Sequence, residues 1–346
     1  MTITTPLPEV TESRKLATIE TIESIREIEG ADAIVCARIR GWDVVVKRDE
    51  FQVGDSCLYI EVDALVPTSD PRFAFLAPRG LRTDPDGRTG HVLKTARLRG
   101  QYSQGLALPL TDFPEVIGAE DVTAVLGIVK WDPPLPTQLA GHVRGTFPSW
   151  IRKTDEERIQ NKAEFLDRPG RWVATEKVDG SSMTVWIRDG EEGIASRNYD
   201  LERTAESTMW ITADALNLHE LLRELGENAT VQGELFGPGI QGNPLNQKEV
   251  RFLAFTLFVD GQEVPRGEWP QSVIDIAVPV YDFPKPATID EAVAQVETLK
   301  SLVAPGRAAE GVVWRNLDAT TMDVRGQKAR ASTKVISRRY LMKNDR

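Results

Sequence analysis

The chain has 346 residues, of which 27% are charged and 41% hydrophobic, and its formal net charge is −10. This length suggests about two domains, each able to bury its own core. The composition is that of an ordinary globular protein, and no apolar run is long enough to span a membrane. The stretch from Met1 to Lys15 is polar and has no apolar signal core. We therefore expect a cytoplasmic, monomeric protein that does not bind membranes.

Cysteine and histidine residues form no metal-binding pattern. Cys36 and Cys57 lie in apolar, strand-like runs and are expected to pack in a core, which argues against a disulfide framework or a zinc site. The histidines are scattered without ligand spacing and are expected to be structural or exposed: His91, His142 and His219.

The N-terminal third has the pattern of a small β-barrel. Apolar and polar residues alternate over 16–28, 33–39 and 42–47, and a turn at 53–55 leads into an apolar, strand-like run up to residue 62. Several short strands within about 110 residues predict a barrel of the OB type, which we place at residues 1–130.

The distribution of charge bears on nucleic-acid binding. The net negative charge argues against it, because neutralised phosphates supply most of the affinity. However, residues 72–99 hold seven basic side chains against two acidic ones, and residues 324–346 hold eight against one. One run in each expected domain fits a clamp around a duplex, although a solvated basic face is the simpler alternative.

Within the first domain, the glycine-bounded segment around residues 97–106 supplies the candidate RNA contacts, which are Arg97, Arg99, Gln101 and Gln104. A barrel that only buttresses the second domain is the alternative. A stiff, proline-rich linker follows at 131–145, and the second domain is expected at 146–346.

Three helices are predicted in the second domain. Thr154 and Glu157 form a capping pair that predicts a short helix start. Apolar residues at helical spacing over 218–225 and 292–299 predict two amphipathic helices, the latter after a capping pair at 288–291.

The most informative element is Glu176-Lys177-Val178-Asp179-Gly180-Ser181, set between strand-like stretches at 171–175 and 183–188. Gly180 and the serines that follow it predict a turn that makes the two strands a hairpin. A lysine at such a junction can attack phosphorus and carry a nucleotide as a phosphoramidate. Surface turns of the same composition also occur, so these residues alone do not decide.

Further segments follow in a fixed order: Ile194–Asn198, Val231–Gly237, Arg251–Leu257, Glu310–Arg315 and Ser332–Ser337. The ordered set resembles the motifs of the covalent nucleotidyltransferases, which include ATP-dependent ligases and mRNA capping enzymes. The upstream module resembles that of one branch of RNA ligases. The chain stops soon after Lys334, leaving no room for the C-terminal OB domain of capping enzymes and DNA ligases, which favours RNA ligase.

The resemblance implies an α+β fold: an OB-like β-barrel followed by a nucleotidyltransferase (ATP-grasp-like ligase) domain of antiparallel sheets flanked by helices. It implies that Lys177, Asp179 and Lys334 are catalytic. The implied ATP-binding residues are Glu176, Lys177, Val178, Gly180, Arg197, Glu234, Phe255, Glu310 and Lys334. Asp179, Glu234 and Glu310 are the implied ligands of Mg²⁺ or Mn²⁺.

Some positions leave alternatives open. Many relatives carry Lys-x-Lys near Lys334, but Ser332 occupies the earlier place, so that contact is missing or is taken over by Lys328 or Arg330. Phe252 and Phe255 face opposite sides of a strand, and we favour Phe255 for stacking on adenine. Relatives also carry an Arg-x-Gln-Asn element, here Arg158, Gln160 and Asn161, which shapes the nucleotide pocket or merely caps a helix.

Attack on ATP requires an uncharged amine, and a free lysine is almost fully protonated at neutral pH. We expect Lys334 and a divalent metal to lower the pKa of Lys177. The expected activity is ATP-dependent sealing of 3′-hydroxyl and 5′-phosphate ends, at nicks with RNA on the 3′-hydroxyl side, through lysyl-AMP and an AMP-capped 5′-phosphate. A GTP-dependent guanylyltransferase and a non-catalytic RNA-binding protein are the alternatives.

Overall fold

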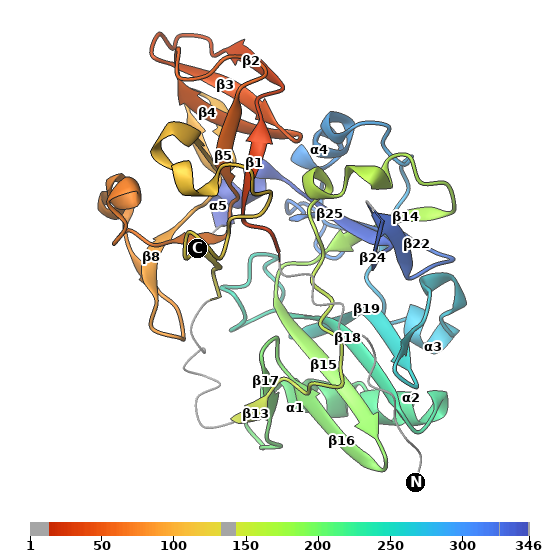
Figure 1. Ribbon diagram of the computed structural model, residues 1–346. Coiled ribbons are helices and arrows are strands. Elements are labelled where there is room, and N and C mark those ends of the chain that lie inside the picture. Colours follow the sequence, from red (N-terminus) through yellow and green to blue (C-terminus); the bar gives the residue numbers. More distant parts are fainter. Residues whose placement is uncertain (1–13, 133–142, 325, 345–346) are drawn as a thin grey trace. The chain divides into compact units, whose positions relative to one another are not determined.

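The computed structural model describes residues 14–132, 143–324 and 326–344 (Figure 1). The chain divides between residues 135 and 136 into two compact units. Most of the linker expected at 131–145, with His142, lies outside the described residues. Within the described part, no helix is long and apolar enough to cross a membrane.

The N-terminal unit consists of short antiparallel strands, as its alternating sequence predicts. One sheet has the order β1 (Ala17–Thr21), β5 (Ser56–Ile60), β11 (Leu106–Pro109), and a second consists of β2 (Ser24–Glu27), β3 (Ile34–Ile39) and β4 (Trp42–Lys47). The remaining strands are β6 (Ala64–Val66), β7 (Arg82–Thr83), β8 (Thr89–Val92), β9 (Ala96–Leu98), β10 (Gln101–Ser103) and β12 (Val129–Lys130), and the short 3₁₀ segments are η1 (Pro71–Arg79), η2 (Leu110–Asp112) and η3 (Pro114–Val116).

Strand β5 separates two apolar clusters of this unit. Its alternate residues Leu58 and Ile60 pack in one cluster, whereas Cys57 and Tyr59 pack in the other. Cys57 and Cys36 are fully buried free thiols, and burial raises their pKa values to about 12 and about 11. The expectation that both cysteines are packing residues is confirmed.

The C-terminal unit is built on two main antiparallel sheets (Figure 1). The larger has the order β13 (Val143–Thr146), β17 (Tyr199–Leu201), β16 (Glu191–Ala195), β15 (Ser181–Arg188), β18 (Ala229–Phe236), β19 (Arg251–Val259), β20 (Gln262–Glu263). The smaller has the order β21 (Val280–Tyr281), β14 (Trp172–Lys177), β22 (Gly311–Asn316), β25 (Ser332–Ile336). The hairpin β23 (Thr321–Val324) and β24 (Gln327–Arg330) precedes β25.

Helices cover one face of each sheet. Helices α1 (Thr208–Ala215) and α2 (Leu218–Leu225) pack on the larger sheet, with Leu218 and Leu222 fully buried. Helix α4 (Ile289–Glu297) packs on the smaller sheet and begins where Thr288 Oγ1 accepts a bond from the backbone N–H of Glu291 (3.1 Å). The helices predicted over 218–225 and 292–299 are confirmed. The other helical segments are η5 (Ile159–Asn161), η6 (Ala163–Phe165), η7 (Arg266–Glu268), α3 (Gln271–Ile274) and α5 (Arg338–Asn344).

The structure corrects two local predictions. No α-helix begins at Thr154, because its hydroxyl donates to Gln232 Oε1 in the larger sheet, and only the 3₁₀ turn η5 follows. Strands β14 and β15 do not form a hairpin either. They belong to different sheets, so the turn at 178–180 crosses from one sheet to the other.

Candidate active site

Lys177 lies where the two sheets of the C-terminal unit meet. It is the last residue of β14 and pairs with Gly311 of β22, while Ser181 begins β15 opposite Leu235 of β18. Between them Gly180 passes so close to the larger sheet that an added Cβ would lie 2.3 Å from the Leu235 carbonyl oxygen. Glycine is therefore required at this crossing, and the crossing places the lysine between the sheets.

Glu310 holds the amine of Lys177. The Nζ atom lies 2.7 Å from both Oε1 and Oε2, and the two side chains are 28% and 12% exposed. Glu310 directly precedes β22, and its backbone carbonyl accepts a bond from the N–H of Ser337 (2.9 Å). Residues 133 positions apart in the chain thus form one ion pair.

Two further carboxylates act on this ion pair. Burial raises the pKa of Glu234 to about 8, with Glu310 and Asp179 adding to the effect and Lys177 opposing it. Burial also raises the pKa of Glu310, together with the charge of Asp179. Burial alone would lower the pKa of Lys177, but Glu310, Glu234 and Asp179 outweigh it and hold that pKa above its ordinary value.

In the protein without ligands the pKa of Lys177 is therefore raised, whereas Lys334 and a divalent metal together are expected from the sequence to lower it. The side chain of Lys334 shares a face of the smaller sheet with Lys177, because Val313 pairs with Thr175 on one side and with Lys334 on the other. Its charge acts to lower the pKa of Glu310. Three carboxylates dominate the amine, so its deprotonation requires that their charge be offset.

Phe255 occupies a β-bulge of the larger sheet. Gln232 pairs with Thr256 but Gly233 pairs with Ala254, so Phe255 is the extra residue on β19. Its ring is partly exposed and lies 5.9 Å from the guanidinium of Arg315, whereas Phe252 is buried in the core below α1 and α2. The bulge leaves Phe255 available for stacking on a flat base.

The side chains of Glu176 and Val178 point away from Lys177 into the interior. The Glu176 carboxylate accepts bonds from Ser301 Oγ (2.5 Å) and the Leu302 N–H (2.7 Å), and burial raises its pKa. Val178 is buried against Phe236. Only the backbone atoms of these two residues could therefore contact a nucleotide.

Arg197 lies nearer the surface, where its guanidinium pairs with Asp155 at 3.0 Å and the side chain is 44% exposed. Its positive charge also opposes the rise in the pKa of Glu234, which places Arg197 within the field of the site.

The structure separates the three candidates for the missing lysine of the Lys-x-Lys pattern. Ser332 is buried and donates to Glu156 Oε2 (2.5 Å). Arg330 is ion-paired with Glu156 (3.3 Å) and Glu263 (2.6 Å), and Lys328 is exposed on the β23–β24 hairpin. Arg330 and Ser332 are committed to a buried network around Glu156, which also pairs with Arg315 at 3.1 Å.

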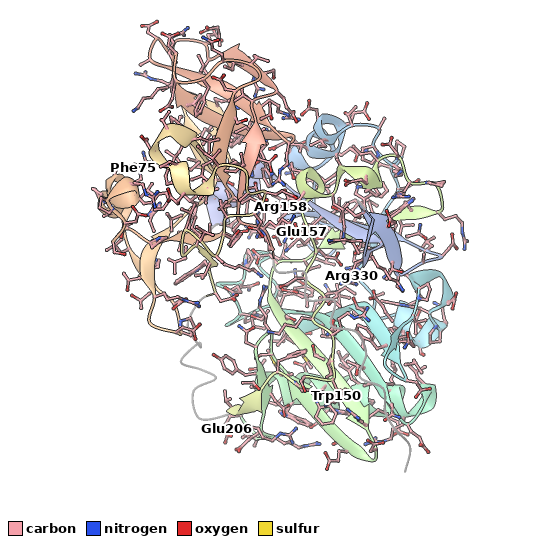
Figure 2. All side chains as sticks on the ribbon, viewed as in Figure 1. Phe75, Trp150, Glu157, Arg158, Glu206 and Arg330 are labelled. Atoms are coloured by element: carbon pink, nitrogen blue, oxygen red, sulfur yellow. The ribbon has the colours of Figure 1, made fainter. Side chains whose placement is uncertain are left out.

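The segment before β14 is attached to β25. The backbone N–H of Lys334 donates to the Glu157 carbonyl (2.7 Å), and Arg158 forms a parallel bridge with Lys334. Figure 2 labels Glu157 and Arg158 in this segment. The buried ammonium of Lys162 donates to the carbonyls of Arg330 (3.0 Å) and Ser332 (3.2 Å). This segment therefore sets the position of Lys334, while the roles expected for Gln160 and Asn161 in a nucleotide pocket stay predictions.

Gly233 and Gly311 are required by the packing of neighbouring strands. A Cβ on Gly233 would meet the Phe252 ring at 2.3 Å, and one on Gly311 would meet the Val335 carbonyl oxygen at 2.0 Å. Neighbouring protein atoms already fill both spaces.

The candidate RNA contacts lie in the N-terminal unit on the β9–β10 hairpin. Arg97 and Arg99 are exposed, and the Arg97 guanidinium lies 5.3 Å from the Tyr102 ring centre. Gln101 is partly exposed and bonds the Tyr102 carbonyl. Gln104 is only 3% exposed and donates to Thr95 Oγ1 (3.2 Å), so its side chain does not suit the expected RNA contact.

The basic run at 72–99 is partly neutralised within its own unit. Arg72 pairs with Asp70 and Glu115, and Arg88 pairs with Asp84 and Asp86. The positive charge available to a polynucleotide is therefore smaller than the sequence count indicates.

The three carboxylates fit a divalent metal by their chemistry. No group of three His, Cys, Asp or Glu side chains in the described ranges forms a ready metal centre. However, Glu234 and Glu310 both have raised pKa values because their negative charges are buried near that of Asp179, and a bound cation would relieve this repulsion. Mg²⁺ commonly binds through one or two carboxylates, waters and substrate phosphates, so such a partial ligand set is sufficient.

Comparisons with known proteins agree with this arrangement. Residues 16–110 match the model of an OB-fold domain, and residues 170–336 match the model of the RNA ligase family. No curated protein sequence matched the chain.

Solved structures of Naegleria gruberi RNA ligase are similar over nearly the whole chain. An aspartate-to-alanine mutant without ligand is 37% identical, with 96% of this chain and 99% of that chain covered and a TM-score of 0.84. A complex with PPi is 37% identical over 96% and 100% of the two chains, with a TM-score of 0.83. A lysine-to-alanine mutant with ATP and Mn is 36% identical over 96% and 99%, with a TM-score of 0.84.

The chain therefore belongs to the RNA ligase family. Within that family it is an ATP-dependent RNA ligase, with an N-terminal OB-fold domain and an α+β ligase domain of antiparallel sheets, as the sequence predicted.

Two features of the site had no usable sequence signal. Tyr340 donates its hydroxyl to Asp179 Oδ2 at 2.7 Å, across 161 residues of chain. Glu156 gathers Ser332, Arg315 and Arg330 into one buried network. The acidic residues at 155–157 are the one weak sequence signal for the Glu156 network, and no nearby residue indicates the bond from Tyr340 to Asp179.

Proposed function

We propose that this ligase joins a 3′-hydroxyl to a 5′-phosphate at nicks in duplexes that carry RNA on the 3′-hydroxyl side, using ATP and Mg²⁺ or Mn²⁺. The observation that carries the proposal is the partly buried ion pair of Lys177 and Glu310, flanked by Glu234 and Asp179. The site lies at the meeting of two sheets that also carry Phe255 and Lys334.

In the first step the Lys177 amine attacks the α-phosphorus of ATP. A phosphorus–nitrogen bond forms, the bond to the β-phosphate oxygen breaks, and pyrophosphate leaves. Before the attack the ammonium must lose a proton, which Glu310 is placed to accept because it already holds Nζ at 2.7 Å. A divalent cation held by Asp179, Glu234 and Glu310 would offset the carboxylate charge that keeps the lysine protonated.

In the second step an oxygen of the RNA 5′-phosphate attacks the AMP phosphorus, and the lysine leaves as an amine. In the third step the 3′-hydroxyl attacks the capped 5′-phosphate, and AMP leaves. Positioning and electrostatic stabilisation supply most of the catalysis in such transfers. Lys334 and Arg197 are the cations that would stabilise the developing phosphate charge.

The β9–β10 hairpin supports the RNA-binding part of this proposal. Arg97 and Arg99 are its exposed cations, and Tyr102 offers a ring beside Arg97. Aromatic rings with neighbouring cations suit stacking and phosphate contact in OB folds. Arg97, Arg99 and Gln101 are therefore the proposed RNA contacts, and Gln104 is not one of them.

A labelling experiment tests the proposal. Purified protein is incubated with α-labelled ATP and Mg²⁺, and the expected result is label on residue 177 in the wild type and none in Lys177→Ala. Lys248→Ala, which changes an exposed lysine of the same unit, is the matched control and should label normally. Labelling by GTP alone would instead support a guanylyltransferase, and no adduct from folded protein would support a non-catalytic RNA-binding protein.

Substrate choice is tested with nicked duplexes that differ only in the sugar at the 3′-hydroxyl end. Faster sealing with ribose than with deoxyribose is expected, because the 2′-hydroxyl and the sugar shape distinguish RNA. Equal rates would contradict the assignment of the RNA strand.

A further inference from the structure

The C-terminal helix α5 reaches the site through one side chain. Tyr340 is only 6% exposed, and its hydroxyl donates a 2.7 Å bond to Oδ2 of Asp179 in the turn between β14 and β15. Asp179 lies two residues after Lys177, so Tyr340 touches the same short turn that carries the lysine.

The segment that carries Tyr340 also contacts Glu310. The backbone N–H of Ser337 donates to the Glu310 carbonyl (2.9 Å), and Ser337 Oγ accepts a bond from the N–H of Tyr340 (3.1 Å). Residues 337–340 are thus bonded to the backbone of Glu310 and to the side chain of Asp179, two residues whose charges act on the amine of Lys177.

A second anchor fixes the start of the helix away from the site. Arg338 pairs with Glu297 of α4 through Nε and Oε1 at 2.7 Å. This ion pair also holds α5 in place, so the docking of the helix does not depend on the Tyr340 hydroxyl alone. Its distinct contribution is the bond to Asp179.

We propose that Tyr340 is a positioning residue for adenylate transfer, because its hydroxyl orients the Asp179 carboxylate toward the lysine and the nucleotide. The inference rests on the proposed function. A hydrogen bond to a charged group restricts its rotation and is worth more than a neutral bond when buried. The bond therefore joins the end of the chain to the turn that carries the nucleophile.

The test is Tyr340→Phe, which keeps the ring and removes one oxygen. The matched control is Tyr59→Phe, since Tyr59 is also buried and its hydroxyl donates a 2.9 Å bond to the Gln104 carbonyl within the N-terminal unit. Lysyl-AMP formation is expected to slow about tenfold in Tyr340→Phe and less than twofold in the control. The Mg²⁺ concentration for half-maximal formation should rise only in Tyr340→Phe.

A double-mutant cycle with Asp179→Ala, which removes the acceptor, separates positioning from a general structural role. If the hydroxyl acts through Asp179, Tyr340→Phe should slow Asp179→Ala little further. Additive losses, or equal losses in Tyr340→Phe and Tyr59→Phe, would overturn the inference.

Arg338→Gln provides a second variant, because it weakens the other anchor of α5 and keeps the hydroxyl. It should lower the unfolding temperature and leave the rate of lysyl-AMP formation close to that of the wild type. Slowed lysyl-AMP formation at an unchanged unfolding temperature would count against the role of Tyr340. Wild-type protein that forms no lysyl-AMP would refute the proposed function. Normal labelling in both the wild type and Tyr340→Phe would refute only the role of Tyr340.

Discussion

The raised pKa of Glu234 makes a quantitative prediction about stability. In the folded protein this pKa is about 8, above the ordinary value of 4.5, because the carboxyl is buried near Glu310 and Asp179. Between these two pH values the folded state holds a proton that the unfolded state has lost. The contribution of this proton to the free energy of unfolding is fully present below pH 4.5 and is lost as the pH rises from 4.5 through 8.

The magnitude follows from linkage. From pH 6 to pH 8 the folded state holds about one proton more than the unfolded state. At ~1.4 kcal/mol per pH unit, the free energy of unfolding therefore falls by roughly 2–3 kcal/mol over this range. In metal-free buffer, Glu234→Gln should remove this loss, because its amide does not ionise. The variant should therefore already be more stable than the wild type at pH 6, because the unfolded carboxyl is ionised above pH 4.5, and the difference should widen by roughly 2–3 kcal/mol by pH 9.

Urea unfolding of both proteins at pH 6, 7, 8 and 9 with a chelator present measures the difference. Glu224→Gln, which changes an exposed glutamate on α2, is the control and should follow the wild type. Parallel stability curves for Glu234→Gln and the wild type would show that the carboxyl is not held protonated. Added Mg²⁺ should reduce the difference at pH 9 by binding the ionised wild-type site.

Three other predictions follow from the contacts. Glu310→Gln should slow lysyl-AMP formation about 100-fold, measured by quenched labelling with ATP, and near-normal labelling would contradict its role as partner of the amine. Glu156→Gln should lower unfolding free energy by about 3–5 kcal/mol because Arg315 and Arg330 would lose a buried counter-ion, and an unchanged melting temperature would argue against the network. Arg99→Ala should weaken RNA binding and reduce the salt slope by about one, and an unchanged slope would exclude a phosphate contact.

Local sequence patterns predicted several of the elements correctly. Alternation identified the strands of the N-terminal unit, and helical spacing with a capping pair identified α2 and α4. Both patterns act over a few residues, where side-chain direction follows directly from backbone geometry. The capping pair at Thr154 failed because that hydroxyl bonds to Gln232, 78 residues away, in preference to a local N–H.

The class of chemistry could be predicted from the sequence, because the ordered motifs around Lys177, Glu234 and Glu310 resemble those of the covalent nucleotidyltransferases. Only the tertiary structure decided the state of the amine and the partners of its neighbours. The ion pair with Glu310 and the bond from Tyr340 to Asp179 join residues 133 and 161 positions apart. Burial by itself would lower the pKa of Lys177, but Glu310, Glu234 and Asp179 outweigh it and hold the lysine protonated until their charge is offset, and no local pattern measures this balance.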